Sequence, residues 1–283
     1  MFRAPLIGRL AAATIVCAAA VAAPLLAGPA SAAVPGRTTN FQFTSYTSAN
    51  KGIRVDCPNG TTLIGAAPSL AGGEGQVRFD QVVPYDDHLY VHAVEDEDGF
   101  AYTWSVGATV ICADKPTGYQ IVPSTSTTTS DQYNSVAADC PGTQNLLGMG
   151  FAINGGNGEV GIDDVTATSS TRATGWAFED RTGYSGQWSL TMYAICSGPL
   201  PGYEIVAAQG PDQSASSATE TATCAIAGNK VIGGGGKIDG GLGTVVLDDL
   251  TFTPTSFSIK AYEDEAGVSG TWHLHAYAIC ARP

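Results

Sequence analysis

The sequence predicts an all-β protein made of three tandem antiparallel β repeats, each about 84 residues long. A ten-residue motif occurs three times, with its tryptophan at Trp104, Trp188 and Trp272, which are 84 residues apart. Each copy alternates apolar and polar residues and ends at a cysteine, as is typical of a half-buried strand. Few other stretches combine helical apolar periodicity with helix-forming residues, so helices are not expected.

The first 32 residues are typical of a secretion signal peptide. Arg3 and Arg9 supply a positive start, residues 10–26 are apolar, and Ala30–Ala32 is a small-residue cleavage site. We therefore expect an extracellular, secreted protein that loses Cys17 with the signal.

The charge of the mature chain argues against two classes of partner. The signal contains two arginines and no acidic residue, so 11 basic and 26 acidic residues remain after cleavage. Nucleic acids and anionic membranes attract basic surfaces, which this composition does not provide. We expect no nucleic-acid partner and no membrane insertion, and instead a glycan or a protein on a surface as the partner.

The cysteines define the repeats and their disulfides. The repeats are predicted at 36–116, 117–199 and 200–283, and each contains one early and one late cysteine. One disulfide per repeat is therefore expected, giving the pairs Cys57–Cys112, Cys140–Cys196 and Cys224–Cys280. Short connectors favour three equivalent sheets packed around a pseudo-threefold axis, as in a prism, with three small β-sandwiches in a row as the alternative.

Glycines punctuate the predicted strands at equivalent places. Gly65, Gly148 and Gly233 lie inside predicted strands, where glycine usually marks a bulge or a close backbone approach. A Gly-Gly-x-Gly motif follows each strand and predicts a tight hairpin. The next strand is predicted to end at an aspartate, which is Asp80, Asp163 or Asp248.

A Glu-Asp-x-x-Gly motif near the end of each repeat is the clearest repeated polar feature. One interpretation is a turn in which the aspartate accepts hydrogen bonds from backbone amides and the glycine adopts positive φ. The other is a ligand site or a hard-cation site, with calcium as the candidate although no cofactor is required. The residues concerned are Glu95, Asp96, Glu179, Asp180, Glu263 and Asp264.

Two groups of side chains differ between the repeats and therefore do not follow from the fold. His273 and His275 lie two residues apart on one strand face, and they predict a zinc site if a third ligand reaches them. In the second repeat, aromatic residues predict a platform for a sugar ring or a partner protein, or else a covering of the outer sheet face. These residues are Trp176, Phe178, Tyr184 and Tyr193.

The segments Cys140–Gly148 and Trp188–Cys196 resemble repeats of small secreted actinobacterial proteins of unknown function. The resemblance extends over all three repeats and implies secretion and a β-rich repeat, with no activity or site to carry over. The predicted packing is similar to that of β-prism proteins such as vitelline membrane outer layer protein and the jacalin-like lectins, by analogy of repeat number and strand content.

No Gly-x-Ser-x-Gly or His-Glu-x-x-His motif occurs in the sequence. We therefore expect a non-enzymatic binding module for a surface glycan or cell-wall polymer, in which the threefold repetition provides avidity. The alternatives are a protein-partner role, as a protease inhibitor, assembly component or toxin accessory, and a metal-dependent hydrolase centred on the histidine pair.

Overall fold

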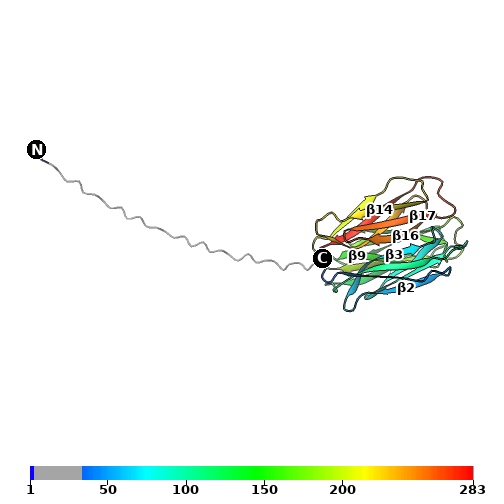
Figure 1. Cartoon of the computed structure of the whole chain (residues 1–283), viewed down its shortest axis with the longest axis horizontal. Coiled ribbons are helices and arrows are strands. Elements are labelled where there is room, and N and C mark those ends of the chain that lie inside the picture. Colours follow the sequence, from blue (N-terminus) through cyan, green and yellow to red (C-terminus); the bar gives the residue numbers. More distant parts are fainter. Residues whose placement is uncertain (3–33, 283) are drawn as a thin grey trace. The chain divides into compact units, whose positions relative to one another are not determined.

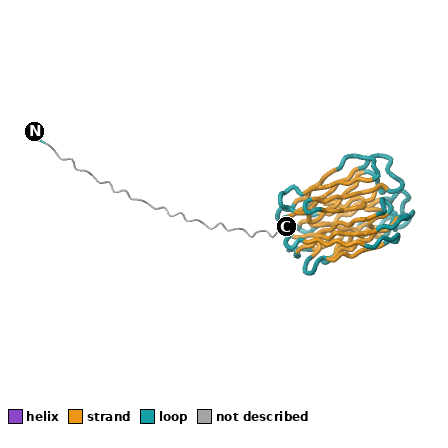
Figure 2. The backbone as a smooth tube through the Cα atoms, viewed as in Figure 1, coloured by secondary structure: helices purple, strands orange, loops and turns teal. Residues whose placement is uncertain are grey.

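A computed structural model describes residues 1–2 and 34–282, so the predicted signal segment lies almost entirely outside the described residues. The compact unit that follows consists of strands joined by loops and turns, and the described residues contain no helix (Figures 1 and 2). The prediction of an all-β protein is confirmed. Consequently, no described helix could span a membrane.

Each repeat contributes six strands. The first contains β1 (Thr38–Phe43), β2 (Lys51–Asp56), β3 (Thr62–Ala71), β4 (Val77–Pro84), β5 (His88–Glu95) and β6 (Ser105–Ala113). The second contains β7 (Gln120–Thr125), β8 (Tyr133–Asp139), β9 (Asn145–Asn154), β10 (Val160–Ser169), β11 (Arg172–Glu179) and β12 (Ser189–Ser197). The third contains β13 (Glu204–Gln209), β14 (Ser217–Thr223), β15 (Lys230–Asp239), β16 (Val245–Phe252), β17 (Ser256–Glu263) and β18 (His273–Ala281).

These strands form three six-stranded antiparallel sheets, and each sheet is shared by two repeats. Sheet I has the order β1-β6-β3-β16-β17-β14, sheet II β2-β5-β4-β9-β12-β7, and sheet III β13-β18-β15-β10-β11-β8. Strands β3 and β16, which belong to the first and third repeats, pair through Asp249 and Ser69 and lie side by side in Figure 1. This exchange of strands excludes three separate β-sandwiches, because no repeat forms a sheet alone.

Three glycines bring the repeats together around a pseudo-threefold axis. Gly65, Gly148 and Gly233 each follow a β-bulge, and each lies against the backbone of another repeat. The first repeat contacts the third in this way, the second contacts the first, and the third contacts the second. A Cβ atom on Gly148 would lie 2.6 Å from the carbonyl oxygen of Ile64. The prediction that these glycines mark bulges or close approaches is confirmed, and the cyclic contacts place the three sheets around one axis, as predicted.

The Gly-Gly-x-Gly motif forms a tight turn, but the predicted hairpin is wrong. The strands on its two sides, such as β3 and β4, belong to different sheets, so the motif is a corner that carries the chain from one sheet to the next. Its last glycine has positive φ and packs against the Glu-Asp backbone of the preceding repeat, as Gly158 does against Glu95. Both motifs therefore recur because they close the ring of repeats.

The predicted strand end at Asp80, Asp163 or Asp248 is also wrong. Strands β4, β10 and β16 continue for several residues beyond this aspartate, which is the unpaired residue of a β-bulge. An acidic residue resembles a strand end in the sequence because it interrupts the apolar alternation. A bulge produces the same interruption without ending the strand.

The repeated tryptophans are fully buried and their indoles are hydrogen-bonded. Trp188 Nε1 donates to Glu179 Oε1 at 3.0 Å, and Trp104 and Trp272 bond Glu95 and Glu263 in the same way. The three predicted disulfides are present, and each connects two sheets, as Cys140 after β8 and Cys196 in β12 do.

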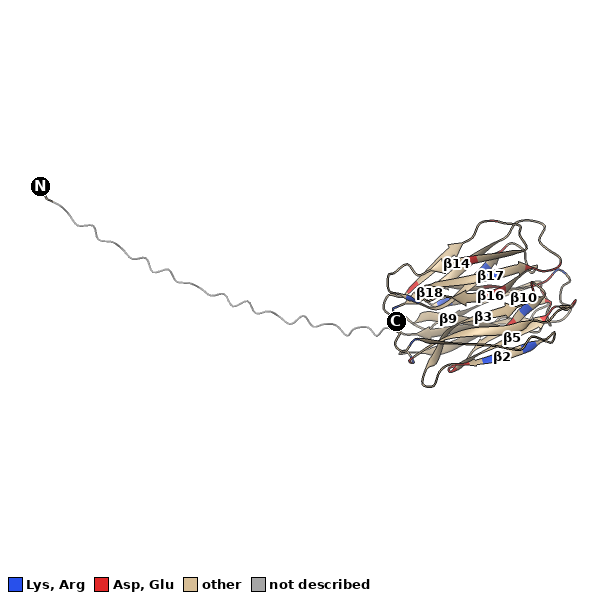
Figure 3. Cartoon of the chain, viewed as in Figure 1, with Lys and Arg blue, Asp and Glu red and all other residues tan. Residues whose placement is uncertain are grey.

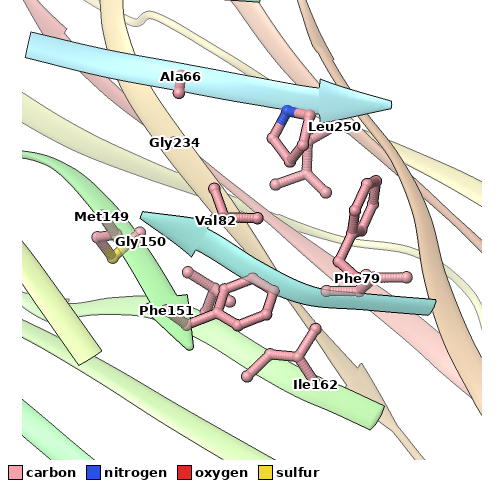
Figure 4. A pocket seen from close by; sticks show the side chains of 12 residues that line it. Ala66, Phe79, Val82, Met149, Gly150, Phe151, Ile162, Gly234 and Leu250 are labelled. Atoms are coloured by element: carbon pink, nitrogen blue, oxygen red, sulfur yellow. The ribbon is translucent and has the colours of Figure 1, made fainter. Parts of the chain in front are cut away.

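The space between the sheets is filled by apolar side chains. Figure 4 shows Phe79, Phe151, Ile162 and Leu250 converging from strands of all three sheets. The small internal gap that they leave is lined by apolar side chains and glycine alone. This region is the hydrophobic core and offers no polar group to a ligand.

Replacing Trp188 with alanine should lower the free energy of unfolding by about 3–5 kcal/mol, because it opens a cavity and leaves the buried Glu179 without its donor. Trp176→Ala, at a partly exposed tryptophan, should cost clearly less. Urea unfolding followed by circular dichroism gives both values, and equal losses would contradict the assignment of Trp188 to the core.

Gly148→Ala should destabilise the protein by about 1–3 kcal/mol or prevent folding, because the added methyl group meets the backbone of the neighbouring repeat. Gly270→Ala is the matched control, since a Cβ there has no neighbour within 4 Å. Thermal unfolding of the two variants is the measurement. A neutral Gly148→Ala would show that the repeats do not approach closely at the axis.

Candidate functional site

The outer face of sheet III carries the chemically richest row of side chains. The strand registers align Gln209, His275, Lys237, Asp164 and Trp176 across β13, β18, β15, β10 and β11. The equivalent row of sheet II holds Thr125, Thr191, Ala152, Gln81 and His92. Charged side chains are sparse over the strands as a whole (Figure 3), so this row is a local concentration of polar groups.

Three aromatic rings cluster at the β8–β11 side of this face. Tyr133 lies 5.9 Å from Trp176 and 5.7 Å from Phe178 between ring centroids, and the latter two rings are 6.4 Å apart. Tyr133 is exposed, whereas Trp176 and Phe178 are half-buried. The three rings therefore form an aromatic cluster with one exposed member, and aromatic rings are side chains on which a sugar ring can stack.

Only part of the predicted aromatic platform is assembled. Trp176 and Phe178 lie together, but Tyr193 lies on β12 in sheet II. Tyr184 follows β11, folds over Gly186 and packs against the core. The four residues therefore do not form a single platform. Tyr133, from β8, completes the cluster instead.

The two predicted metal ligands lie on the opposite side of the same face, together with an aspartate. His275 Nε2 lies 2.7 Å from Asp239 Oδ2, and His273 Nε2 lies 3.4 Å from the same oxygen. The two Nε2 atoms are 3.1 Å apart. Burial raises the pKa of Asp239, but Lys237 and His275 outweigh this effect and hold the pKa below its usual value. The carboxylate is therefore ionised at neutral pH.

Between these two groups lies a buried pair of adjacent carboxyl groups, Asp163 and Asp164. Burial and their mutual repulsion raise the pKa of Asp163, and burial raises the pKa of Asp164 as well. Each has a buried Oδ1 with no hydrogen-bond partner, and protonation of one carboxyl group would remove the repulsion between the two. Asp248 and Asp249 repeat the arrangement in sheet I, so the pair belongs to the repeated bulge.

The acidic Glu-Asp-x-x-Gly loops meet at one end of the axis. Asp96, Asp180 and Asp264 each accept a backbone hydrogen bond from the glycine of their own motif, and these glycines have positive φ, which confirms the predicted turn. The other oxygen of each carboxylate faces Arg78, which is 1 % exposed. The guanidinium occupies the position between the three carboxylates that a hard cation would need.

Burying Asp96, Asp180 and Asp264 around Arg78 is energetically unfavourable at neutral pH, because one positive charge cannot compensate three negative charges. Burial raises the pKa of Asp96 to about 7 and that of Asp264 to about 6, against the opposing effect of Arg78. The glutamates of the same motifs bond the buried indoles. The structure therefore gives all six acidic residues a structural partner, while ligand binding by them stays a prediction.

Sequence reasoning missed Arg78, Tyr133 and Asp239. Each occupies a position where the repeats differ: Arg78 replaces Gly161 and Val246, and the other two likewise lack counterparts of the same type. Asp239 carries the same signal as the histidines: it faces outward, and the other repeats have Ala71 and Asn154 at its position.

No family model matches the chain, and no curated protein sequence is similar to it.

A second group of potential metal ligands among the described residues, Glu204 with Cys224 and Cys280, is excluded because the two sulfurs form a disulfide. The outer face of sheet III is therefore the candidate site, argued from its own geometry.

The free energy of unfolding should rise as the pH falls from 8 to 5. Carboxyl groups with a raised native pKa bind protons on folding, so their stabilising contribution is complete below the unfolded pKa near 4 and is lost as the pH rises through the native pKa. Asp248→Asn mimics the protonated form. It should stabilise the protein at pH 8, by about 1 kcal/mol or more, and have little effect at pH 5.

Urea unfolding at several pH values tests this prediction. Asp98→Asn, at an exposed loop position, is the matched control and should leave the pH dependence unchanged. A free energy of unfolding that is lower at pH 5 than at pH 8 would contradict the assignment of buried, proton-binding carboxyl groups.

Proposed function

We propose that the protein is a secreted, non-enzymatic binding protein for an uncharged surface polysaccharide, such as a cell-wall polymer. The observation that carries this proposal is the cluster of Tyr133, Trp176 and Phe178 on the outer face of sheet III. Apolar ring faces stack on the C–H face of a sugar, and neighbouring polar groups bond its hydroxyls. Lys237 and Gln209 lie along the same face and supply such groups.

A second aromatic pair supports multivalent binding. Phe41 and Phe43 on β1 are 54 % and 62 % exposed, and their rings are stacked at 5.8 Å. With Tyr46 they border a shallow hollow on sheet I that is floored by small residues such as Gly107. Two aromatic surfaces on one rigid unit allow one molecule to contact a polymer at two points, which raises the apparent affinity.

The charge of the chain selects among polysaccharides. The formal net charge is −13 and the sheet III face itself contains carboxylates, so anionic polymers are repelled. Stacking is indifferent to charge, so an uncharged polymer is the favoured ligand. Three disulfides and the predicted signal segment support an extracellular setting, where such polymers occur.

Trp176→Ala should reduce binding to insoluble neutral polysaccharides about tenfold, because it removes the largest of the three rings of the cluster. The measurement is a depletion assay with cellulose, chitin and an anionic pectate, using wild-type protein and variants of equal thermal stability. Tyr102→Ala, at a 73 % exposed tyrosine outside both aromatic surfaces, is the matched control.

The double variant Phe41→Ala/Phe43→Ala should weaken binding further when combined with Trp176→Ala. Wild-type protein that binds none of the neutral polymers, or that prefers pectate, would refute the proposal. Equal losses in the Tyr102 and Trp176 variants would remove the aromatic cluster as its basis.

A further inference from the structure

We infer that Asp239, His273 and His275 form a binding site for one Zn²⁺ ion on the outer face of sheet III. All three side chains offer a ligand atom, and these atoms lie within 4.8 Å of one another. Imidazole nitrogen and carboxylate oxygen are ordinary zinc ligands. The inference rests on the geometry of these residues and does not depend on polysaccharide binding.

The three ligand atoms have the spacing that a single ion needs. The distances between the two Nε2 atoms and Asp239 Oδ2 are 2.7, 3.1 and 3.4 Å, so the circle through them has a radius of about 1.8 Å. A zinc ion about 2.0–2.2 Å from each atom therefore fits slightly above their plane. The fourth position of a tetrahedral site is then left for a water molecule.

Outer hydrogen bonds orient two of the ligands, His273 and Asp239. His273 Nδ1 lies 2.7 Å from Asp212 Oδ1, which fixes the proton on Nδ1 and leaves Nε2 unprotonated, as a metal ligand must be. Metal-bound histidines almost always donate their other ring N–H to a carboxylate, a backbone carbonyl or a water molecule, and Asp212 is such a partner. Lys237 Nζ lies 2.6 Å from Asp239 Oδ1 and thereby turns Oδ2 toward the histidines. Gln209 Nε2 also reaches His273 Nε2 at 3.1 Å, so its amide has to move when the metal binds.

The repeats provide an internal comparison that separates this cluster from the needs of the fold. The positions equivalent to Asp239, His273 and His275 hold Asn154, Ser189 and Thr191 in the second repeat, where Asn154 Nδ2 bonds Thr191 Oγ1 at 3.1 Å. In the first repeat they hold Ala71, Ser105 and Gly107. Small neutral residues therefore satisfy the same strand register twice, and folding does not require the two histidines and the aspartate.

Isothermal titration calorimetry of the disulfide-bonded protein with ZnCl₂ alone tests the inference. We expect one Zn²⁺ per chain in the wild type. His273→Ser/His275→Thr, which installs the residues of the second repeat, should abolish this binding without changing the thermal unfolding midpoint by more than a few degrees. Asp239→Asn should weaken binding at least tenfold, and Asp212→Asn by about 10–100-fold.

His88→Ser is the matched control, because His88 also pairs with an aspartate, Asp87, at 2.7 Å but belongs to no group of three ligands among the described residues. It should bind Zn²⁺ as the wild type does. Substitution by Co²⁺ provides a second readout, since a tetrahedral site produces intense visible absorption that the double variant should lack. Absence of stoichiometric Zn²⁺ uptake by the wild type, or unchanged uptake by the double variant, would overturn the inference.

Discussion

The close approach of three strand backbones at the pseudo-threefold axis is the constraint on which the rest of the structure depends. Gly65, Gly148 and Gly233 have no side chain, so each strand reaches the carbonyl groups of the preceding repeat. Because the repeats meet there, strands β4, β10 and β16 enter the sheet of a neighbour, and no repeat buries its apolar face alone. Folding is therefore expected to be cooperative across all three repeats.

The packing of the three repeats around one axis also explains why the Glu-Asp-x-x-Gly motif is repeated. Its three copies meet at one place and form a single structural cluster, so they are not three independent binding sites. The glutamate anchors the tryptophan, the aspartate turns the loop, and the three loops meet around a single Arg78. One arginine pairs with the aspartates of all three repeats. Three identical repeats would place three arginines there, so this arrangement requires the repeats to differ at the position of Arg78. Burying several carboxyl groups is unfavourable at neutral pH, and the disulfides across the sheet boundaries offset part of that cost.

Function is expected where the symmetry is broken on an outward surface. Sheet III joins the second repeat, which supplies the aromatic cluster, to the third, which supplies the histidines. Trp176 and His275 share one transverse row and are separated by three strand spacings, about 14 Å. An extended polymer can span that distance along the row. The two proposed sites are thus neighbours on one rigid surface and share Lys237 and Gln209, although each has its own cluster of side chains.

The sequence by itself determined the local features: the strand content, the glycines beside the bulges, the buried tryptophans, the disulfide pairs and the shared face of His273 and His275. Each follows from spacing along the chain, because alternation decides which face a residue occupies. Only the tertiary structure decided that Asp239 joins the histidines, that Tyr133 rather than Tyr193 joins Trp176, and that Arg78 sits among the aspartates. A period of two specifies the face of a strand but not its neighbours, and here the neighbours come from closure of the chain around the axis.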